Sequence, residues 1–267
     1  MISFRDVLGG LKKLELDPQS RVIFHGSLSS FGEVRGGTET VLGAVLAIVQ
    51  GTMAPTFTYR VMVTPEEGPE NNGIVYGSGR DQNRMAEFFQ ADMPADPLMG
   101  VLAETLRRHP TARRSRHPLL SFSGIHTEEI LEVQTMEDPL APIGKLAEGG
   151  AWVLLMGVDQ SSNSSIHYAE KLAGRKQFVR WALTPQGVRA CSGFPGCSDG
   201  FEALSPLIEG ITRRIQIGDA RVQAIPLQEM IQIAAQKITS DPLALLCSRN
   251  DCERCNAVRS AVLSPAS

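Results

Sequence analysis

The sequence has no long apolar run. Nowhere do about 18 consecutive apolar residues occur, as a membrane-spanning helix would require. The first residues lack the basic region, apolar run and small-residue cleavage site of a secretory signal peptide. The 26 basic residues are balanced by 29 acidic ones, so no excess of positive charge favours nucleic acid binding. We therefore expect a cytoplasmic protein that binds neither membranes nor nucleic acid.

Three familiar site signatures are also missing. The chain contains no G-x4-G-K-[ST] phosphate loop and no G-x-G-x-x-G after a predicted strand. It contains no G-x-S-x-G nucleophile elbow, so its serines give little support to a hydrolase of that type. Cys191 and Cys197 could each be a nucleophile, but neither has a partner base nearby in the sequence.

What the chain does have is an alternation of apolar strands and amphipathic helices. A strand, a helix and a second strand follow one another at 21–26, 38–50 and 52–61, a unit that generates parallel pairing. Further along, the pattern predicts a loop at 64–84, a helix at 98–108, a buried strand at 151–157, a β-hairpin at 177–194, a helix at 201–211, a strand at 220–227 and a helix at 227–238. We therefore expect a single α/β domain over residues 1–267. Its central sheet is expected to be mixed and largely parallel, with helices on both faces in three layers, a long loop insertion and a β-hairpin.

One short element carries most of the catalytic signal. The buried strand at 151–157 leads into a serine-rich loop, and a predicted helix with His167 and Glu170 follows. Residues three apart lie on one face of a helix, so the imidazole and the carboxylate can contact each other. Such pairs are most often solvated surface pairs, but open α/β sheets bind ligands at the carboxyl ends of their strands. His167 is therefore a candidate general base that Glu170 orients.

Two other segments could bind phosphate groups. The turn after the strand at 21–26 is rich in serine and glycine, a composition that suits either a phosphate or simple helix capping. The basic stretch RRSRHP at 113–118 could clamp a phosphate or could form a solvated surface. No run of aromatic residues interleaves these arginines, which disfavours an RNA-binding surface.

Cysteine is scarce and odd in number. Three of the five cysteines, Cys247, Cys252 and Cys255, follow a C-x4-C-x2-C spacing. With Cys197 or Cys191 as a fourth ligand they could hold a structural zinc ion. A set of reduced thiols without any metal is the other interpretation, and no neighbouring fourth ligand completes the pattern, so we assign no metal ligand from the sequence.

Three segments, taken together, resemble the aminoglycoside 3-N-acetyltransferase (antibiotic N-acetyltransferase) family. They are FHGSLSSFGEVRGG at 24–37, RRSRHPLLSFSG at 113–124 and LLMGVDQSSNSSIHYAE at 154–170, and they occur in the family's order. Two further pieces, PENNGIVYG and DPLALLCSRNDCERCN, are similar to a divergent branch of the family. The resemblance implies transfer of an acetyl group from acetyl-coenzyme A to a primary amine. The 3-amino group of an aminoglycoside is the expected acceptor, and antibiotic resistance the expected context.

The resemblance also implies roles for individual residues. Coenzyme A would lie along the first turn, beside Ser27, Leu28, Ser29, Gly32 and Val34. Arg114 and Ser115, in an R-S-x-H-P motif, would approach the phosphate or pantetheine of the coenzyme. His167 and Glu170 match the family's His-x-x-Glu and would be catalytic, and Ser164 would supply a donor to the oxyanion. Family members commonly carry threonine where Ser164 stands, so the hydroxyl is kept.

Other interpretations stay open. A coenzyme A-binding, zinc-stabilised relative without aminoglycoside activity is one, and hydrolysis of a thioester by water is another. A polycationic acceptor would favour an acidic pocket, for which the candidates are Glu66, Glu67, Glu70, Asp81, Glu128 and Glu129. The sequence decides neither the acceptor, nor the regiochemistry, nor whether the protein is a monomer or a homodimer.

Overall fold

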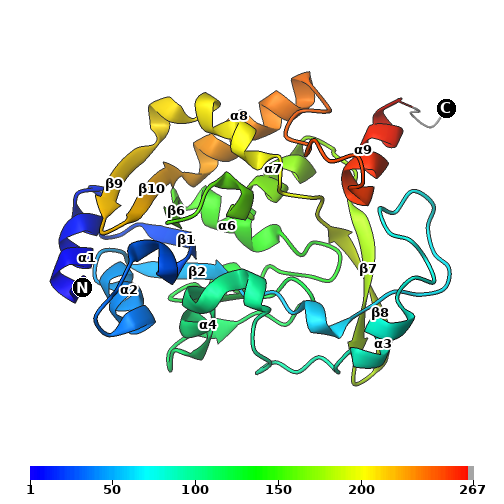
Figure 1. Ribbon diagram of the computed structural model, residues 1–267, viewed down its shortest axis with the longest axis horizontal. Coiled ribbons are helices and arrows are strands. Elements are labelled where there is room, and N and C mark those ends of the chain that lie inside the picture. Colours follow the sequence, from blue (N-terminus) through cyan, green and yellow to red (C-terminus); the bar gives the residue numbers. More distant parts are fainter. Residues whose placement is uncertain (264–267) are drawn as a thin grey trace.

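A computed structural model describes residues 1–263 of the chain (Figure 1). Its strands are β1 (Arg21–Gly26), β2 (Gly51–Pro55), β3 (Met62–Val63), β4 (Arg113–Arg114), β5 (Phe122–Ile125), β6 (Trp152–Met156), β7 (Phe178–Thr184), β8 (Gly187–Phe194), β9 (Arg213–Ile217) and β10 (Ala220–Pro226). Its α-helices are α1 (Phe4–Lys12), α2 (Gly37–Leu46), α3 (Arg80–Met85), α4 (Gly100–Arg108), α5 (Glu128–Leu131), α6 (Ala141–Glu148), α7 (Ile166–Leu172), α8 (Leu227–Ser240) and α9 (Glu253–Leu263). Short 3₁₀ helices occupy Leu28–Phe31, Tyr59–Val61, Pro97–Met99, Gln160–Ser162, Phe201–Leu207 and Glu209–Ile211.

The strands form two sheets. Seven of them make a central sheet in the order β4-β5-β2-β1-β6-β10-β9, and β3, β7 and β8 make a second sheet to its side (Figure 1). The central sheet is mixed, as predicted, but parallel pairing is limited to β1 with β2 and β1 with β6. The other four pairings are antiparallel, so the sheet is less parallel than expected. At one edge the reason is a tight turn at Gly218, since a two-residue connection between β9 and β10 permits only antiparallel pairing.

The predicted three layers are present. Successive side chains of a strand point to opposite faces, and the central strands follow this period. Val22, Phe24 and Leu154 pack with residues of α1, α2 and α4, whereas Ile23, Val153 and Leu155 pack with residues of α6, α7 and α8. Because both faces are apolar and covered, these strands are continuous hydrophobic runs in the sequence.

Other expectations are met in part. The β7–β8 hairpin is present, and residues 64–84 are mostly loop, with α3 beginning near their end. The helix expected at 201–211 consists instead of two 3₁₀ segments, and Pro206 lies inside the first, where it cannot donate to an α-helical ladder. Helix α6 and strand β9 were not expected. No helix within residues 1–263 is both long enough and apolar enough to span a bilayer.

Candidate functional site

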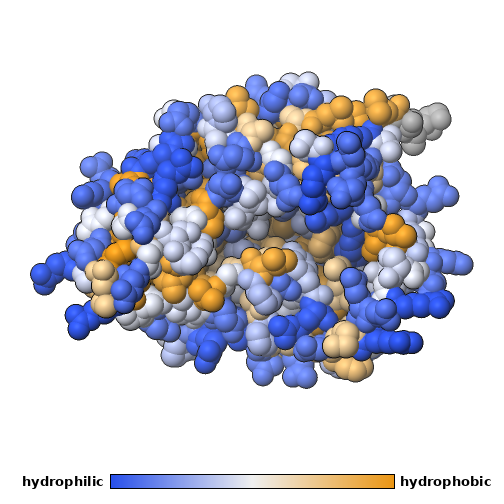
Figure 2. All heavy atoms as spheres, viewed as in Figure 1, coloured by the Kyte–Doolittle hydropathy of each residue, from blue (hydrophilic) through white to orange (hydrophobic). Residues whose placement is uncertain are grey.

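The carboxyl ends of β1 and β6 open into a cavity of about 1210 Å³. Its lining comes from the turn after β1, the loop after β6, the start of α4, the second sheet, the loop after β8 and the start of α9. Figure 2 shows this face of the molecule hollowed between the two sheets, where apolar and polar residues meet. Pockets for a single small ligand usually measure about 300 to 1,000 Å³, so this cavity has room for more than one ligand.

Three buried side chains are connected by hydrogen bonds, and the last of them reaches the cavity. His167 Nδ1 lies 2.6 Å from Glu170 Oε2, and Arg175 Nη1 donates to Glu170 Oε1 at 2.8 Å. Glu170 is only 1% exposed, and Arg175 is 7% exposed. His167 itself lines the cavity, and within residues 1–263 its Nε2 has no hydrogen-bond partner. The carboxylate therefore orients the ring through Nδ1, while His167 is part of the cavity lining.

The end of α7 explains how Arg175 reaches Glu170. Gly174 has a φ of +72°, the left-handed conformation that glycine adopts without cost. Arg175 N donates to the carbonyl of Glu170 at 2.9 Å and Gly174 N to that of Lys171 at 3.0 Å, which is the Schellman pattern of a helix end. The chain thus reverses, and Arg175 Nη2 also donates to the carbonyls of Pro242 and Ala244, at 2.9 and 2.6 Å.

The loop between β6 and α7 is held by its own side chains. Asp159 accepts from Ser161 N at 2.9 Å, and Asn163 donates to Gln160 Oε1 at 2.9 Å and accepts from Ser165 N at 3.1 Å. Gln160, Asn163 and Ser165 are fully buried. This leaves Ser161, Ser162 and Ser164 on the cavity side, together with His167.

The predicted coenzyme-binding turn also lines the cavity. All five of its named residues, Ser27, Leu28, Ser29, Gly32 and Val34, are part of the lining. The turn begins as a 3₁₀ helix, and Ser30 Oγ donates to the carbonyl of Gly157 at 2.8 Å, which ties the turn after β1 to the end of β6. His25, just before it, is also part of the lining, and burial lowers its pKa to about 3, so the ring is neutral.

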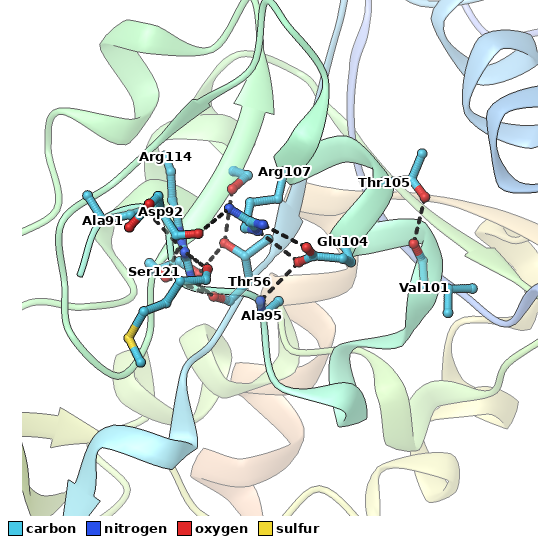
Figure 3. Close-up of polar contacts among 12 residues, drawn as sticks. Thr56, Ala91, Asp92, Ala95, Val101, Glu104, Thr105, Arg107, Arg114 and Ser121 are labelled. Carbon is cyan, nitrogen blue, oxygen red and sulfur yellow. Dashed lines mark hydrogen bonds and ion pairs between the residues drawn. The ribbon is translucent and has the colours of Figure 1, made fainter. Parts of the chain in front are cut away.

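Arg114 and Ser115 are not among the residues that line the cavity. The Arg114 guanidinium instead donates to Ser121 Oγ at 3.1 Å and to backbone carbonyls of Thr56, at 2.6 Å, and of Ala91, at 3.2 Å (Figure 3). Ser115 Oγ accepts from Phe122 N at 2.9 Å. Arg107 and Glu104 lie beside this cluster and form a bidentate pair (Figure 3). These contacts fasten the segment before α4 to the sheet, so the hydrogen bonds of Arg114 are structural.

His117, from the same motif, is a core residue. It is 4% exposed, and its Nδ1 accepts from the backbone amides of Leu119 and Leu120, at 3.2 and 2.9 Å. Burial lowers the pKa of His117 to about 4, so the ring is neutral in the folded protein near pH 7.

The cysteines separate into a cluster and a single residue. Cys197, Cys247, Cys252 and Cys255 lie together, whereas Cys191 lies apart in β8. Burial raises the pKa of the Cys191 thiol to about 12, so it is a poor nucleophile at neutral pH.

None of the six acidic residues considered for an acidic pocket lines the cavity, and the carboxylates in its lining are those of Asp199 and Glu253.

Three arginines of the site were missed in the sequence. Arg175 follows Glu170 by five residues, beyond the end of the helix, so no helical spacing pointed to it. Arg180 stacks on Phe178 and Phe194, and Arg254 Nη1 donates to the carbonyl of Gly196 at 2.8 Å. Both line the cavity, and only the tertiary fold brings them there.

Comparison with known proteins gives one family. The sequence profile described as aminoglycoside 3-N-acetyltransferase matches residues 23–239. The SPbeta prophage-derived aminoglycoside N(3')-acetyltransferase-like protein YokD of Bacillus subtilis is 32% identical over 175 residues, which cover 60% of this chain and 61% of that protein. Aminoglycoside N(3)-acetyltransferase VII of Streptomyces paromomycinus is 33% identical over 181 residues, which cover 63% of this chain and 61% of that enzyme. The matched segment thus spans about three fifths of the length of these relatives.

Solved structures share the fold. The crystal structure of YokD from Bacillus subtilis superposes with a TM-score of 0.77 and 26% identity, covering 89% of this chain and 99% of that one. The structure described as AAC-IIIb binary with CoASH superposes with a TM-score of 0.71 and 21% identity, covering 89% of this chain and 96% of that one.

The substitution Arg114→Lys should lower the free energy of unfolding without weakening the binding of a ligand in the cavity. A lysine cannot reach the spread acceptors of the guanidinium, and the loss of these hydrogen bonds to a charged group costs on the order of 3 kcal/mol in total. Urea unfolding measures the loss, and calorimetric titration measures coenzyme A binding. Arg113→Lys, at the exposed neighbour, is the control. A stable Arg114→Lys protein with weakened coenzyme binding would contradict the structural role.

His117 should make the protein less stable as the pH falls below about 6.5. The unfolded chain takes up a proton near the ordinary histidine pKa of 6.5, whereas folded His117, with its pKa at about 4, does not. Stability is therefore lost as the pH falls from about 6.5 toward 4, by about 1.4 kcal/mol between pH 7.5 and 5.5. His117→Asn keeps an acceptor for the two amides and cannot titrate. Urea unfolding of both proteins at both pH values should show a drop smaller by that amount in His117→Asn, and equal drops would contradict the assignment.

Proposed function

Since this chain belongs to the aminoglycoside 3-N-acetyltransferase family, we propose that it transfers the acetyl group of acetyl-coenzyme A to a primary amine, the 3-amino group of an aminoglycoside. The observation that carries the proposal is the hydrogen-bonded series of Arg175, Glu170 and His167, which ends at the cavity in a ring nitrogen without a partner among the described residues. The names of the relatives support the acceptor, and the coenzyme in the AAC-IIIb structure supports the donor.

The proposed chemistry uses His167 as the general base. An amine is mostly protonated at neutral pH and must lose a proton before it attacks a thioester. The ammonium form first releases one proton to solvent. His167 Nε2 then takes a second proton from the neutral amine while the amine nitrogen bonds to the carbonyl carbon. The carbon–sulfur bond then breaks, and the departing thiolate takes the proton from the imidazolium. The products are an amide and the free thiol of coenzyme A.

Two neighbours assist His167 in this scheme. Glu170, against Nδ1, fixes the tautomer and stabilises the imidazolium that exists between the two proton transfers. Ser164 lines the same cavity three residues before His167, and its hydroxyl is the proposed donor to the tetrahedral oxyanion.

We place the coenzyme against the turn after β1. Ser27, Leu28, Ser29, Gly32 and Val34 all face the cavity, so hydroxyls and backbone of this turn can contact pantetheine and pyrophosphate. Arg114 has no part in this arrangement, because its guanidinium serves internal acceptors. A zinc ion, if held by the cysteine cluster, would be bound by thiolates and not by the reacting groups.

The acceptor is proposed to lie on the other side of His167, toward α9. The carboxylates of Asp199 and Glu253 line the cavity there and suit the ammonium groups of an amino sugar. Two guanidinium groups, of Arg180 and Arg254, are also part of the lining, so its charges balance. An acceptor with few amino groups therefore fits this lining better than a strongly polycationic one. A cytoplasmic location and a monomeric or dimeric state stay predictions.

Thiol release from acetyl-coenzyme A, measured against a panel of aminoglycosides and simple amino sugars, tests the proposal. We expect turnover with compounds that carry a free 3-amino group, and none with 3-N-blocked compounds or without an amine. His167→Ala should abolish turnover while calorimetry still shows coenzyme binding, and His109→Ala, outside the cavity, should behave as the wild type.

Each alternative function has its own outcome in this experiment. Release that needs no amine would indicate thioester hydrolysis. Coenzyme binding without turnover on any amine would indicate a binding protein. Wild-type activity in His167→Ala would remove this residue from the mechanism.

Arg175 should act as a positioning residue. In Arg175→Met the buried Glu170 carboxylate loses a charged partner and two carbonyls lose their donor, so His167 is held less well. Because misplacement of a catalytic group by about 1 Å can cost on the order of 10²-fold, we expect a loss of that size in kcat with the KM for acetyl-coenzyme A unchanged. Arg175→Lys should recover part of it, and Arg189→Met, on the exposed part of β8, is the control. An equal rise in KM with kcat retained would contradict the positioning role.

A further inference from the structure

Four thiols meet beside the cavity without a disulfide bond. The sulfur atoms of Cys197, Cys247, Cys252 and Cys255 all lie within 4.8 Å of one another. Each of the four residues is 5% exposed or less. They come from two distant parts of the chain, the loop after β8 and the segment that leads into and begins α9.

The donor set and its spacing match one kind of ligand. In a tetrahedral zinc tetrathiolate the Zn–S distance is about 2.3 Å, which separates the sulfurs by about 3.8 Å. The observed cluster is close to that size. Thiolates are soft donors that select zinc over magnesium or calcium, and four protein ligands leave no open position for a substrate. The arrangement therefore suits a closed, structural metal site.

The packing around the cluster provides little other attachment for the segment that contains α9. The four cysteines form a cluster of their own, outside the two apolar cores of the sheet. Among residues 1–263, Leu246 is the one partly buried apolar residue that packs against it. Helix α9 buries few large apolar side chains, its buried residues being Cys255, Ala257 and Val258. A segment with so small an apolar contact can gain attachment from a metal, as small domains with small cores do.

The neighbours of the ligands form part of the cavity wall. Gly196 and Arg254 each precede a cluster cysteine, both line the cavity, and Arg254 Nη1 donates to the Gly196 carbonyl at 2.8 Å. The backbone at Gly196 approaches Glu170, since a Cβ added there would lie 3.7 Å from both carboxylate oxygens. The cluster is therefore joined through single residues to the wall and to the carboxylate that orients His167.

We propose that Cys197, Cys247, Cys252 and Cys255 bind one zinc ion as four thiolates, and that this structural site fastens the α9 segment to the loop after β8 as a wall of the cavity. Cys191 takes no part, because it lies outside the cluster. The site would stabilise the folded chain, since metal binding to a preformed cluster contributes folding free energy.

Elemental analysis of the full chain, purified without added metal, tests the zinc site. We expect about one zinc per chain, as for a single four-ligand site. In Cys197→Ser the zinc content should fall toward zero, whereas Cys191→Ser, which removes the one cysteine outside the cluster, should keep it. Because Cys197→Ser could fail to fold, the wild-type protein is also produced with cobalt. It should then show the visible absorption of tetrahedral cobalt thiolate.

The number of thiols that react with a thiol reagent tests separately whether the cluster binds a metal. In the zinc-bound wild type the four cluster thiols should react with a thiol reagent only after a chelator has removed the metal. Metal-free wild-type protein with reactive cluster thiols, or disulfides among the four cysteines found by mass spectrometry, would overturn the proposal. These measurements do not depend on acetyl transfer, so they stand whether or not the proposed activity is found.

Hydrogen exchange tests whether the metal holds this wall of the cavity in place. On chelation, amides at 194–200 and 247–258 should exchange faster, while those of β1 and β6 should stay protected. Equal exchange in these segments with and without zinc would show that the metal does not hold the wall.

Discussion

The geometry of the site depends on the burial of one carboxylate. Glu170 is almost fully removed from water, and an ionised carboxylate there is tolerated only when it is paired and hydrogen-bonded. Arg175 provides the charge on one side, and His167 occupies the other oxygen. The requirement fixes the end of α7, because only a chain reversal at Gly174 returns Arg175 to Glu170. The orientation of the histidine is thus set by the same contacts that make the fold stable.

Periodicity and local spacing predicted the frame of this arrangement. Most of strand β6 and the middle of β1, residues 22–24, are buried on both faces and are unbroken apolar runs in the sequence. The i, i+3 spacing predicted the contact between His167 and Glu170. Strand β9 was missed because its sequence, RRIQI, is mostly exposed and carries little apolar pattern. Arg175 was missed because it lies beyond the end of α7, where no helical spacing applies. Arg254 was missed because it reaches Gly196 through a tertiary contact that leaves no trace in sequence spacing.

Composition alone did not show which contacts several polar residues make. The arginines of RRSRHP were read as a phosphate clamp or a solvated face, yet Arg114 is an internal hydrogen-bond donor and His117 a core acceptor. The acidic residues of the long loop and of α5 were candidates for a pocket, and they lie outside the cavity lining. The cysteine spacing identified three members of the cluster, but only the fold distinguishes Cys197 from Cys191 as the fourth. A polar side chain is informative in sequence only when its partners are near in sequence, and here most are not.

The cavity walls belong to different parts of the architecture. The turn after β1 is tied to the central sheet through Ser30 and Gly157, while Gly196 belongs to the loop after β8 and Arg254 to α9. A ligand that touches both walls connects regions that only the complete tertiary structure brings together. Its binding free energy is therefore added to the unfolding free energy of the whole molecule and not to that of one loop. In this protein, the occupancy of the cavity by a ligand and the cooperativity of unfolding therefore depend on each other.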